Sequence, residues 1–403
     1  MNMMHGCRIG RRKVISGTGV TTVTKGVVYA TQEVSRMIKQ NRRGFTLVEL
    51  AAVIGAGSLI AAQVMPMAKR ARNTNRGMSS AGNLMQIGQG AGMYGVDNAD
   101  RIPAYTAPGR INGAPYDFNI GGGDTYRVRD SISAIAAEQA EILRRRTGRF
   151  DGDFEIQVSS SRLWNRRWTN LVIMDYLNRP FPDPLFIDPA DANQLTWASD
   201  PLDFDAGSTV PYANGIPAGY DSDGNWVSDQ VRNRWAFASS YQTTASAWQP
   251  DGLDGPSYHP VADTPHLFGN NGFGQGPDIP FGREFGEVRF PSAKVYQFEE
   301  FDREQAGNPY FAYDQARSEK LMFDGSVNNW ASGDASPSFN VDQPGANGKA
   351  EWRQTYVPID TFPVPLGGLG DDTLLSQRYR WTLGGLQGVD YPMPIMGSNV
   401  RRR

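Results

Sequence analysis

The fold of this chain is decided by the stretch Arg42-Arg43-Gly44-Phe45-Thr46-Leu47-Val48-Glu49-Leu50 and by the apolar run behind it. From Phe45 to Met65, 21 residues contain no Lys, Arg or Asp, and Glu49 is the only acid. At 1.5 Å per residue this run forms a helix of roughly 31 Å, about the thickness of a bilayer's hydrocarbon core. An acid inside such a helix costs about 2.5–3.5 kcal/mol on insertion scales, so Glu49 needs a partner.

These residues resemble the processing site of type IV pilins and of type II secretion pseudopilins. In that family a prepilin peptidase cuts after the glycine, here Gly44, and the new N-terminal residue, here Phe45, is N-methylated. The acid five residues into the processed chain, here Glu49, pairs with the terminal amine of a neighbouring subunit, and many pilins carry a helix-kinking proline where this chain has Pro66. An ordinary signal anchor explains the apolar run but not Gly44, Phe45 and Glu49 together.

Charge is unevenly distributed along the 403 residues. Residues 1–44 hold nine of the 40 Lys and Arg and one of the 42 Asp and Glu, a net charge of +8. The remainder therefore carries −10, which argues against nucleic acid as the main partner. The 45 glycines and 26 prolines indicate many turns and long loops.

The only cysteine, Cys7, lies in the segment that processing after Gly44 removes. The processed chain then has neither a disulfide nor a thiolate metal site. Met37 offers an alternative start, with a leader of only eight residues, 37–44, like many short pilin leaders. Either leader keeps its Lys and Arg in the cytoplasm, as the positive-inside rule requires.

The apolar helix is expected to continue to about Asn98 as an amphipathic helix. Leu84, Ile87, Ala91 and Tyr94 form one apolar stripe at helical spacing. The glycines between them weaken an isolated helix, so this half should be helical only because the rest of the protein packs against it. The segment 83–103 also looks like the end of the stem helix in a large subfamily of pilin-like proteins.

Residues 101–165 read as an insertion that contains one helix. Asp130 can cap a helix over 131–147, and Gly148 can end it. The triplet Arg144-Arg145-Arg146 suits the negative end of the helix dipole, and a solvated helix end is favoured over a lipid or partner contact.

From Trp168 the pattern of the subfamily resumes. A helix over 168–177 leads to Leu185-Phe186-Ile187-Asp188-Pro189-Ala190-Asp191, which resembles the family's Phe-x-Cys-Pro-x-Asp turn with Asp188 in place of cysteine. Strands are expected at 234–241 and 293–298. Residues 320–330 resemble the subfamily's Phe-x-Asp-Gly hairpin, and 380–386 could form a short edge strand and turn.

Three groups of residues have a chemical and a structural interpretation. Asp221, Asp223 and Asn225 place oxygens as a calcium loop does, but Gly224 falls at the wrong position and a hairpin turn is favoured. Glu299, Glu300 and Asp302 could act in acid–base chemistry, but a solvated strand end is favoured. The nine tryptophans could line a glycan surface, but core positions are favoured.

No enzyme motif stands out. The chain has no P-loop and no Gly-x-Ser-x-Gly elbow, and His259 and His266 lack the spacing of a metal pair. We therefore expect no enzyme activity, no cofactor, no metal and no nucleic-acid partner.

The sequence predicts an α+β protein whose long N-terminal helix packs on an antiparallel sheet in a loop-rich head. The expected parts are a leader (1–44, or only 37–44), a transmembrane and filament-core helix (45–67), an amphipathic stem (68–100) and an extracytoplasmic head (101–403). The resemblance implies a subunit of a pilus or secretion pseudopilus that works with prepilin peptidase, other pilin subunits, an inner-membrane assembly platform and the membrane. The alternative is a single-pass anchored protein that binds a glycan or another surface ligand and never polymerises.

Overall fold

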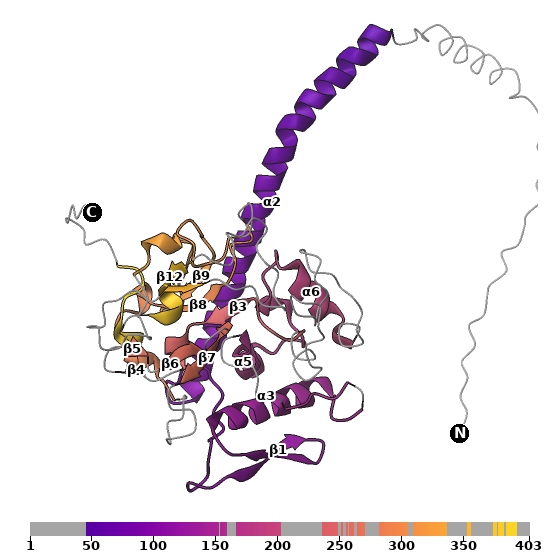
Figure 1. Cartoon of the computed structure of the whole chain (residues 1–403). Coiled ribbons are helices and arrows are strands. Elements are labelled where there is room, and N and C mark those ends of the chain that lie inside the picture. Colours follow the sequence, from indigo (N-terminus) through magenta and orange to yellow (C-terminus); the bar gives the residue numbers. More distant parts are fainter. Residues whose placement is uncertain are drawn as a thin grey trace, which may run out of the picture. The chain divides into compact units, whose positions relative to one another are not determined.

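The computed structural model describes residues 46–152, 154–158, 167–202, 236–248, 251–252, 255–256, 258–261, 264–270, 282–304, 309–336, 353–355, 374–376, 378–382 and 384–392. It is a mixed α+β structure that divides into two units, Met1–Ala68 and Lys69–Arg403. Both units contribute to the helix α2 (Leu47–Asp97), which has 51 residues (Figure 1). The expected helix over the apolar run and its extension to about Asn98 are therefore confirmed from Leu47 onward.

The second half of α2 buries one face against the rest of its unit. The predicted stripe is confirmed, since Leu84, Ile87, Ala91 and Tyr94 are all buried. Glycines on this face let other elements approach closely. A β-carbon at Gly88 would lie 3.0 Å from Leu321, and one at Gly90 would lie 3.0 Å from Leu177.

The central sheet has four antiparallel strands in the order β10-β9-β8-β3. They are β3 (Tyr241–Thr243), β8 (Val295–Glu299), β9 (Lys320–Met322) and β10 (Val327–Asn328). The expected hairpin is confirmed. Gly325, with φ of +83°, makes the turn between β9 and β10, and Asp324 accepts hydrogen bonds from the Ser326 amide and hydroxyl.

Residues 101–158 contain a hairpin covered by a helix. The strands β1 (Tyr116–Gly121) and β2 (Asp124–Val128) pair antiparallel, and α3 (Ser131–Thr147) lies along them (Figure 1). The predicted caps of α3 are confirmed, because the Asp130 carboxylate accepts the Ser133 amide and Gly148 adopts the left-handed conformation. The prediction of a solvated helix end is wrong for Arg144, because its side chain is buried and paired with Asp124 and Glu155.

Short helices connect α3 to the sheet. They are α5 (Asn170–Leu177), the 3-10 turn η1 (Pro184–Phe186) and α6 (Ala192–Ser199). Asp183 caps η1 and Asp191 caps α6 through their carboxylates. Between these caps, the Ser240 amide donates to the Phe186 carbonyl, so the predicted Leu185–Asp191 turn lies against β3.

Two of the strand predictions are wrong for most of the residues that the structure describes. Of 234–241, only Tyr241 lies in a strand, and residues 236–240 form turns and coil. For 380–386 the predicted turn is present but the predicted edge strand is wrong, because the chain forms the 3-10 turns η6 (Arg378–Trp381) and η7 (Gly385–Gln387). Further 3-10 turns are η2 (Ala245–Ala247), η3 (Phe285–Glu287), η4 (Pro291–Ala293) and η5 (Ser332–Asp334). Three further pairs of strands are antiparallel: β4 (Asp251–Gly252) with β5 (Gly255–Pro256), β6 (Tyr258–Val261) with β7 (Thr264–Asn270), and β11 (Arg353–Thr355) with β12 (Leu374–Ser376).

Aromatic side chains fill much of the core. Trp168, Trp197 and Trp248 are buried in the largest hydrophobic cluster, as the core interpretation of the tryptophans predicts for these three. A second cluster around Phe298 and Phe311 contains several tyrosines, with ring centroids of these two residues 4.7 Å apart.

Candidate assembly site

The first described residues form a reciprocal cap at the start of α2. Gly44 and Phe45 themselves lie outside the described residues. The Thr46 amide and hydroxyl each donate to the Glu49 carboxylate at 2.9 Å, and the Glu49 amide donates to the Thr46 hydroxyl at 3.2 Å. This is a capping box, in which N-cap and N3 side chains satisfy each other's backbone donors.

The cap gives Glu49 a role within its own chain that the sequence reading did not assign. The spacing Thr46-x-x-Glu49 before an apolar run is typical of such a cap, so the sequence alone was sufficient to predict it. None of these donors carries a positive charge. The cap therefore holds the carboxylate in place but does not neutralise it.

The helix behind this cap exposes apolar side chains on every side. Ten large ones between Leu47 and Met67 are 52% to 84% exposed. Among the described residues, α2 is the one helix long and apolar enough to cross a membrane. Within this segment the Ser58 hydroxyl is satisfied locally, since it donates to the Ile54 carbonyl at 2.7 Å.

Pro66 lies inside α2, which continues on both sides of it. A proline within a helix removes one backbone donor and crowds the preceding turn. The structure thus places Pro66 where a kink is expected, at the end of the apolar run.

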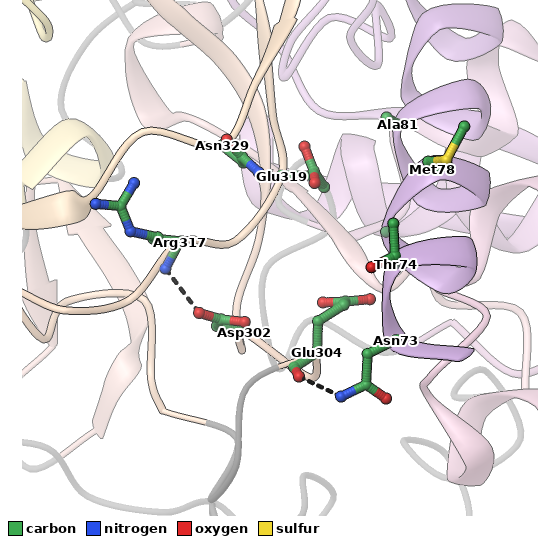
Figure 2. A pocket seen from close by; sticks show the side chains of 10 residues that line it. Asn73, Thr74, Met78, Ala81, Asp302, Glu304, Arg317, Glu319 and Asn329 are labelled. Atoms are coloured by element: carbon green, nitrogen blue, oxygen red, sulfur yellow. Dashed lines mark hydrogen bonds between the residues drawn. The ribbon is translucent and has the colours of Figure 1, made fainter. Parts of the chain in front are cut away.

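The unit Lys69–Arg403 has a polar pocket of about 420 Å³ beside α2 (Figure 2). Asn73, Thr74 and Gly77 line it from the helix, and Asp302, Glu304, Arg317 and Glu319 line it from loops. The Asn73 side-chain amide donates to the Glu304 carbonyl at 2.7 Å, and the Arg317 amide donates to the Asp302 carboxylate at 2.8 Å. The pocket is thus framed by a helix and by loops that hydrogen bonds hold in place.

Two carboxyl groups in this pocket titrate far above the usual range. Burial, reinforced by the charge of Asp188, raises the pKa of Glu304 to about 8. Burial raises the pKa of Glu319 to about 7, although Lys320 opposes this. Both side chains approach α2 at Gly77, where an added β-carbon would lie 3.6 Å from each.

The expected solvated strand end at Glu299, Glu300 and Asp302 is wrong, because all three are buried. The Glu299 carboxylate accepts the Ser80 hydroxyl of α2, and burial raises its pKa well above the usual range. Glu300 pairs with Arg167 and, at 3.0 Å, with Arg380. The partners of these acids come from distant parts of the sequence, which is why local sequence patterns did not reveal them.

Asp188, in the predicted turn that begins at Leu185, is also paired with a basic side chain. Arg303 donates to Asp188 at 3.1 Å and to Asp191 at 2.7 Å, and all three side chains are buried. An ion pair thus connects the turn before α6 to the loop after β8.

Comparison with protein-family models, with curated proteins and with solved structures found no match to this chain. The family resemblance therefore rests on the sequence motifs alone.

In the part of the chain that the structure describes, no group of three or more His, Cys, Asp and Glu is placed to hold a metal ion. The candidate calcium ligands Asp221, Asp223 and Asn225 lie outside the described residues. His259 lies in β6 and His266 lies in β7, and the structure describes only the backbone of these two residues.

Proposed function

We propose that this protein is a pilin-like subunit that is anchored in the inner membrane by α2 and then polymerises into a pilus or secretion pseudopilus. The observation that carries the proposal is the exposed apolar helix Leu47–Met67 with a single acid at its start. The basic-Gly-Phe-Thr-Leu-Val-Glu sequence before it supports processing by prepilin peptidase after Gly44.

Burial energy explains why such a helix needs either lipid or other copies. Covering one exposed Val, Leu, Ile or Met side chain stabilises by about 1.5–3 kcal/mol. Ten large side chains are exposed here. The helix can therefore leave the bilayer only when neighbouring subunits bury the same surface, which is polymerisation.

Glu49 has a specific task in this scheme. Cleavage after Gly44 creates a charged amine on Phe45, and the filament core lacks water to solvate it. A neighbour's Glu49 carboxylate, already oriented by Thr46, neutralises that amine and sets the register between subunits. The inner-membrane assembly platform then adds subunits one at a time.

The test compares three full-length proteins by the fraction released when cells are sheared. Glu49→Gln keeps an oxygen that accepts from Thr46 but removes the charge, so we expect at least a tenfold loss of released filaments with membrane insertion unchanged. The matched control Glu141→Gln removes an acid from the head and should assemble normally. Normal assembly of Glu49→Gln would refute the pairing.

The runner-up is a membrane-anchored exported protein that binds a surface ligand and does not polymerise. The polar pocket beside Gly77 is the feature that favours it. In that case shearing releases nothing, and the wild-type protein stays in the membrane fraction.

A further inference from the structure

Just after the apolar run, α2 carries a cluster of basic side chains within eight residues. The basic cluster consists of Lys69, Arg70, Arg72 and Arg76. Three of these side chains are exposed, and that of Arg76 is partly buried. No acid accompanies them on the helix, because α2 has no Asp or Glu between Glu49 and Asp97. The cluster is thus a concentrated positive charge on an otherwise uncharged stretch of helix.

The basic cluster has no counter-charge within the described part of the chain. None of its four side chains forms an ion pair with a described residue. The pocket acids Glu304 and Glu319 approach α2 at Gly77, one residue beyond Arg76, and pair with none of the four. Like charges this close on a helix repel one another, so a counter-charge from outside the chain would stabilise them.

The position of the cluster along α2 indicates where that counter-charge comes from. Lys69 follows Met65, the last residue of the apolar run, by four residues, about 6 Å along a helix. The headgroup layer of a bilayer extends about 5–8 Å beyond the hydrocarbon core on each side. Helix side chains lean toward the N-terminus, so the long side chain of Arg76 reaches back toward the same layer.

We propose that the basic cluster binds the phosphate groups of anionic phospholipids in the leaflet nearer the head. Guanidinium groups form paired hydrogen bonds with phosphate oxygens, and an anionic membrane surface attracts clustered Lys and Arg. Such binding also offsets a cost, because Lys and Arg normally favour the cytoplasmic end of a membrane helix. The proposal rests on the membrane anchor in the proposed function and does not require filament assembly.

Photo-crosslinking from within the basic cluster tests the lipid contact. A benzophenone amino acid replaces Ala71, which lies between Arg70 and Arg72. The full-length protein is reconstituted into vesicles with equal amounts of phosphatidylglycerol and phosphatidylcholine. Mass spectrometry should find adducts of phosphatidylglycerol at least threefold more often than adducts of phosphatidylcholine. Replacing all four basic residues by glutamine should make the two adducts equally frequent.

Two further variants show whether positive charge at this place is what matters. The matched control removes four exposed cations from the rest of the chain and should keep the excess of phosphatidylglycerol adducts. Its substitutions are Arg101→Gln, Arg110→Gln, Arg127→Gln and Arg145→Gln. The conservative variant changes the three arginines of the basic cluster to lysine, which preserves the charge, and should also keep the excess.

Equal adducts in the wild-type protein, or an excess that survives the four glutamines, would overturn the lipid site. Alkaline carbonate extraction of wild-type cell membranes separates this failure from a failure of the proposed function. If the protein resists extraction, the membrane anchor stands and only the lipid site is wrong. If carbonate removes the protein from the membranes, both the anchor and the lipid site are wrong.

Discussion

At the scale of residues, buried carboxyl groups distinguish this head from a loosely folded, loop-rich domain. Glu299 and Glu300 lie at the end of β8, where local sequence suggests a solvated acidic turn. Their partners Ser80, Arg167 and Arg380 stand 219, 133 and 80 residues away along the chain. No short-range pattern contains that information, whereas the Thr46–Glu49 cap spans only three residues and could have been predicted.

Glu304 and Glu319 should make the stability of the protein depend on pH. Their folded pKa values of about 8 and about 7 lie above the ordinary value of 4.5, so the folded state binds protons more tightly. The contribution of these two groups to stability is then fully present below about pH 4.5 and is lost as pH rises through their folded pKa values of about 7 and about 8. Burial lowers the pKa of Lys320 to about 8 from 10.5, which acts in the opposite direction only above that range.

Denaturant unfolding of the full-length protein in micelles at pH 5 and pH 8 measures this loss. In the double variant Glu304→Gln with Glu319→Gln, the difference in unfolding free energy between pH 5 and pH 8 should be at most half of the wild-type difference. Asp117→Asn, which alters an exposed carboxylate, should leave it unchanged. An unfolding free energy that rises between pH 5 and pH 8 would contradict the raised pKa values of Glu304 and Glu319.

At the scale of elements, regular periodic signals led to correct predictions and short irregular ones did not. The stem helix, the capped helix 131–147 and the Phe-Asp-Gly hairpin follow from spacing, caps and turn glycine. The wrong edge strand at 380–386 has a physical reason, since Arg380 turns inward to Glu300 and stands 4.4 Å from the Phe311 ring centroid. Tertiary contacts thus override a weak local preference for extended structure.

The ion pairs of Arg303 connect two such elements, the turn before α6 and the loop after β8. Arg303→Ala leaves the buried Asp188 and Asp191 without their charge partner, so we expect a loss of about 3–5 kcal/mol in unfolding free energy. The control Arg127→Ala removes an exposed ion pair and should cost less than about 1 kcal/mol. Equal effects of the two substitutions on chemical denaturation would show that the Arg303 pairs do not hold these elements together.

At the scale of the whole molecule, one helix carries two different surfaces. Leu47–Met67 is apolar on every side, and the half beyond it buries Leu84, Ile87, Ala91 and Tyr94 against the rest of its unit. The proposed filament accounts for the apolar half, because neighbouring copies would cover it.

The central claim is entry into the pilin pathway, and the N-terminus of the mature protein tests it most directly. Mass spectrometry should be applied to protein from wild-type cells and from cells that lack prepilin peptidase. We predict a chain that begins with methylated Phe45 in the first and retains Gly44 and its leader in the second. An intact leader in wild-type cells, or a cut after Met67, would contradict the account and favour the anchored binding protein.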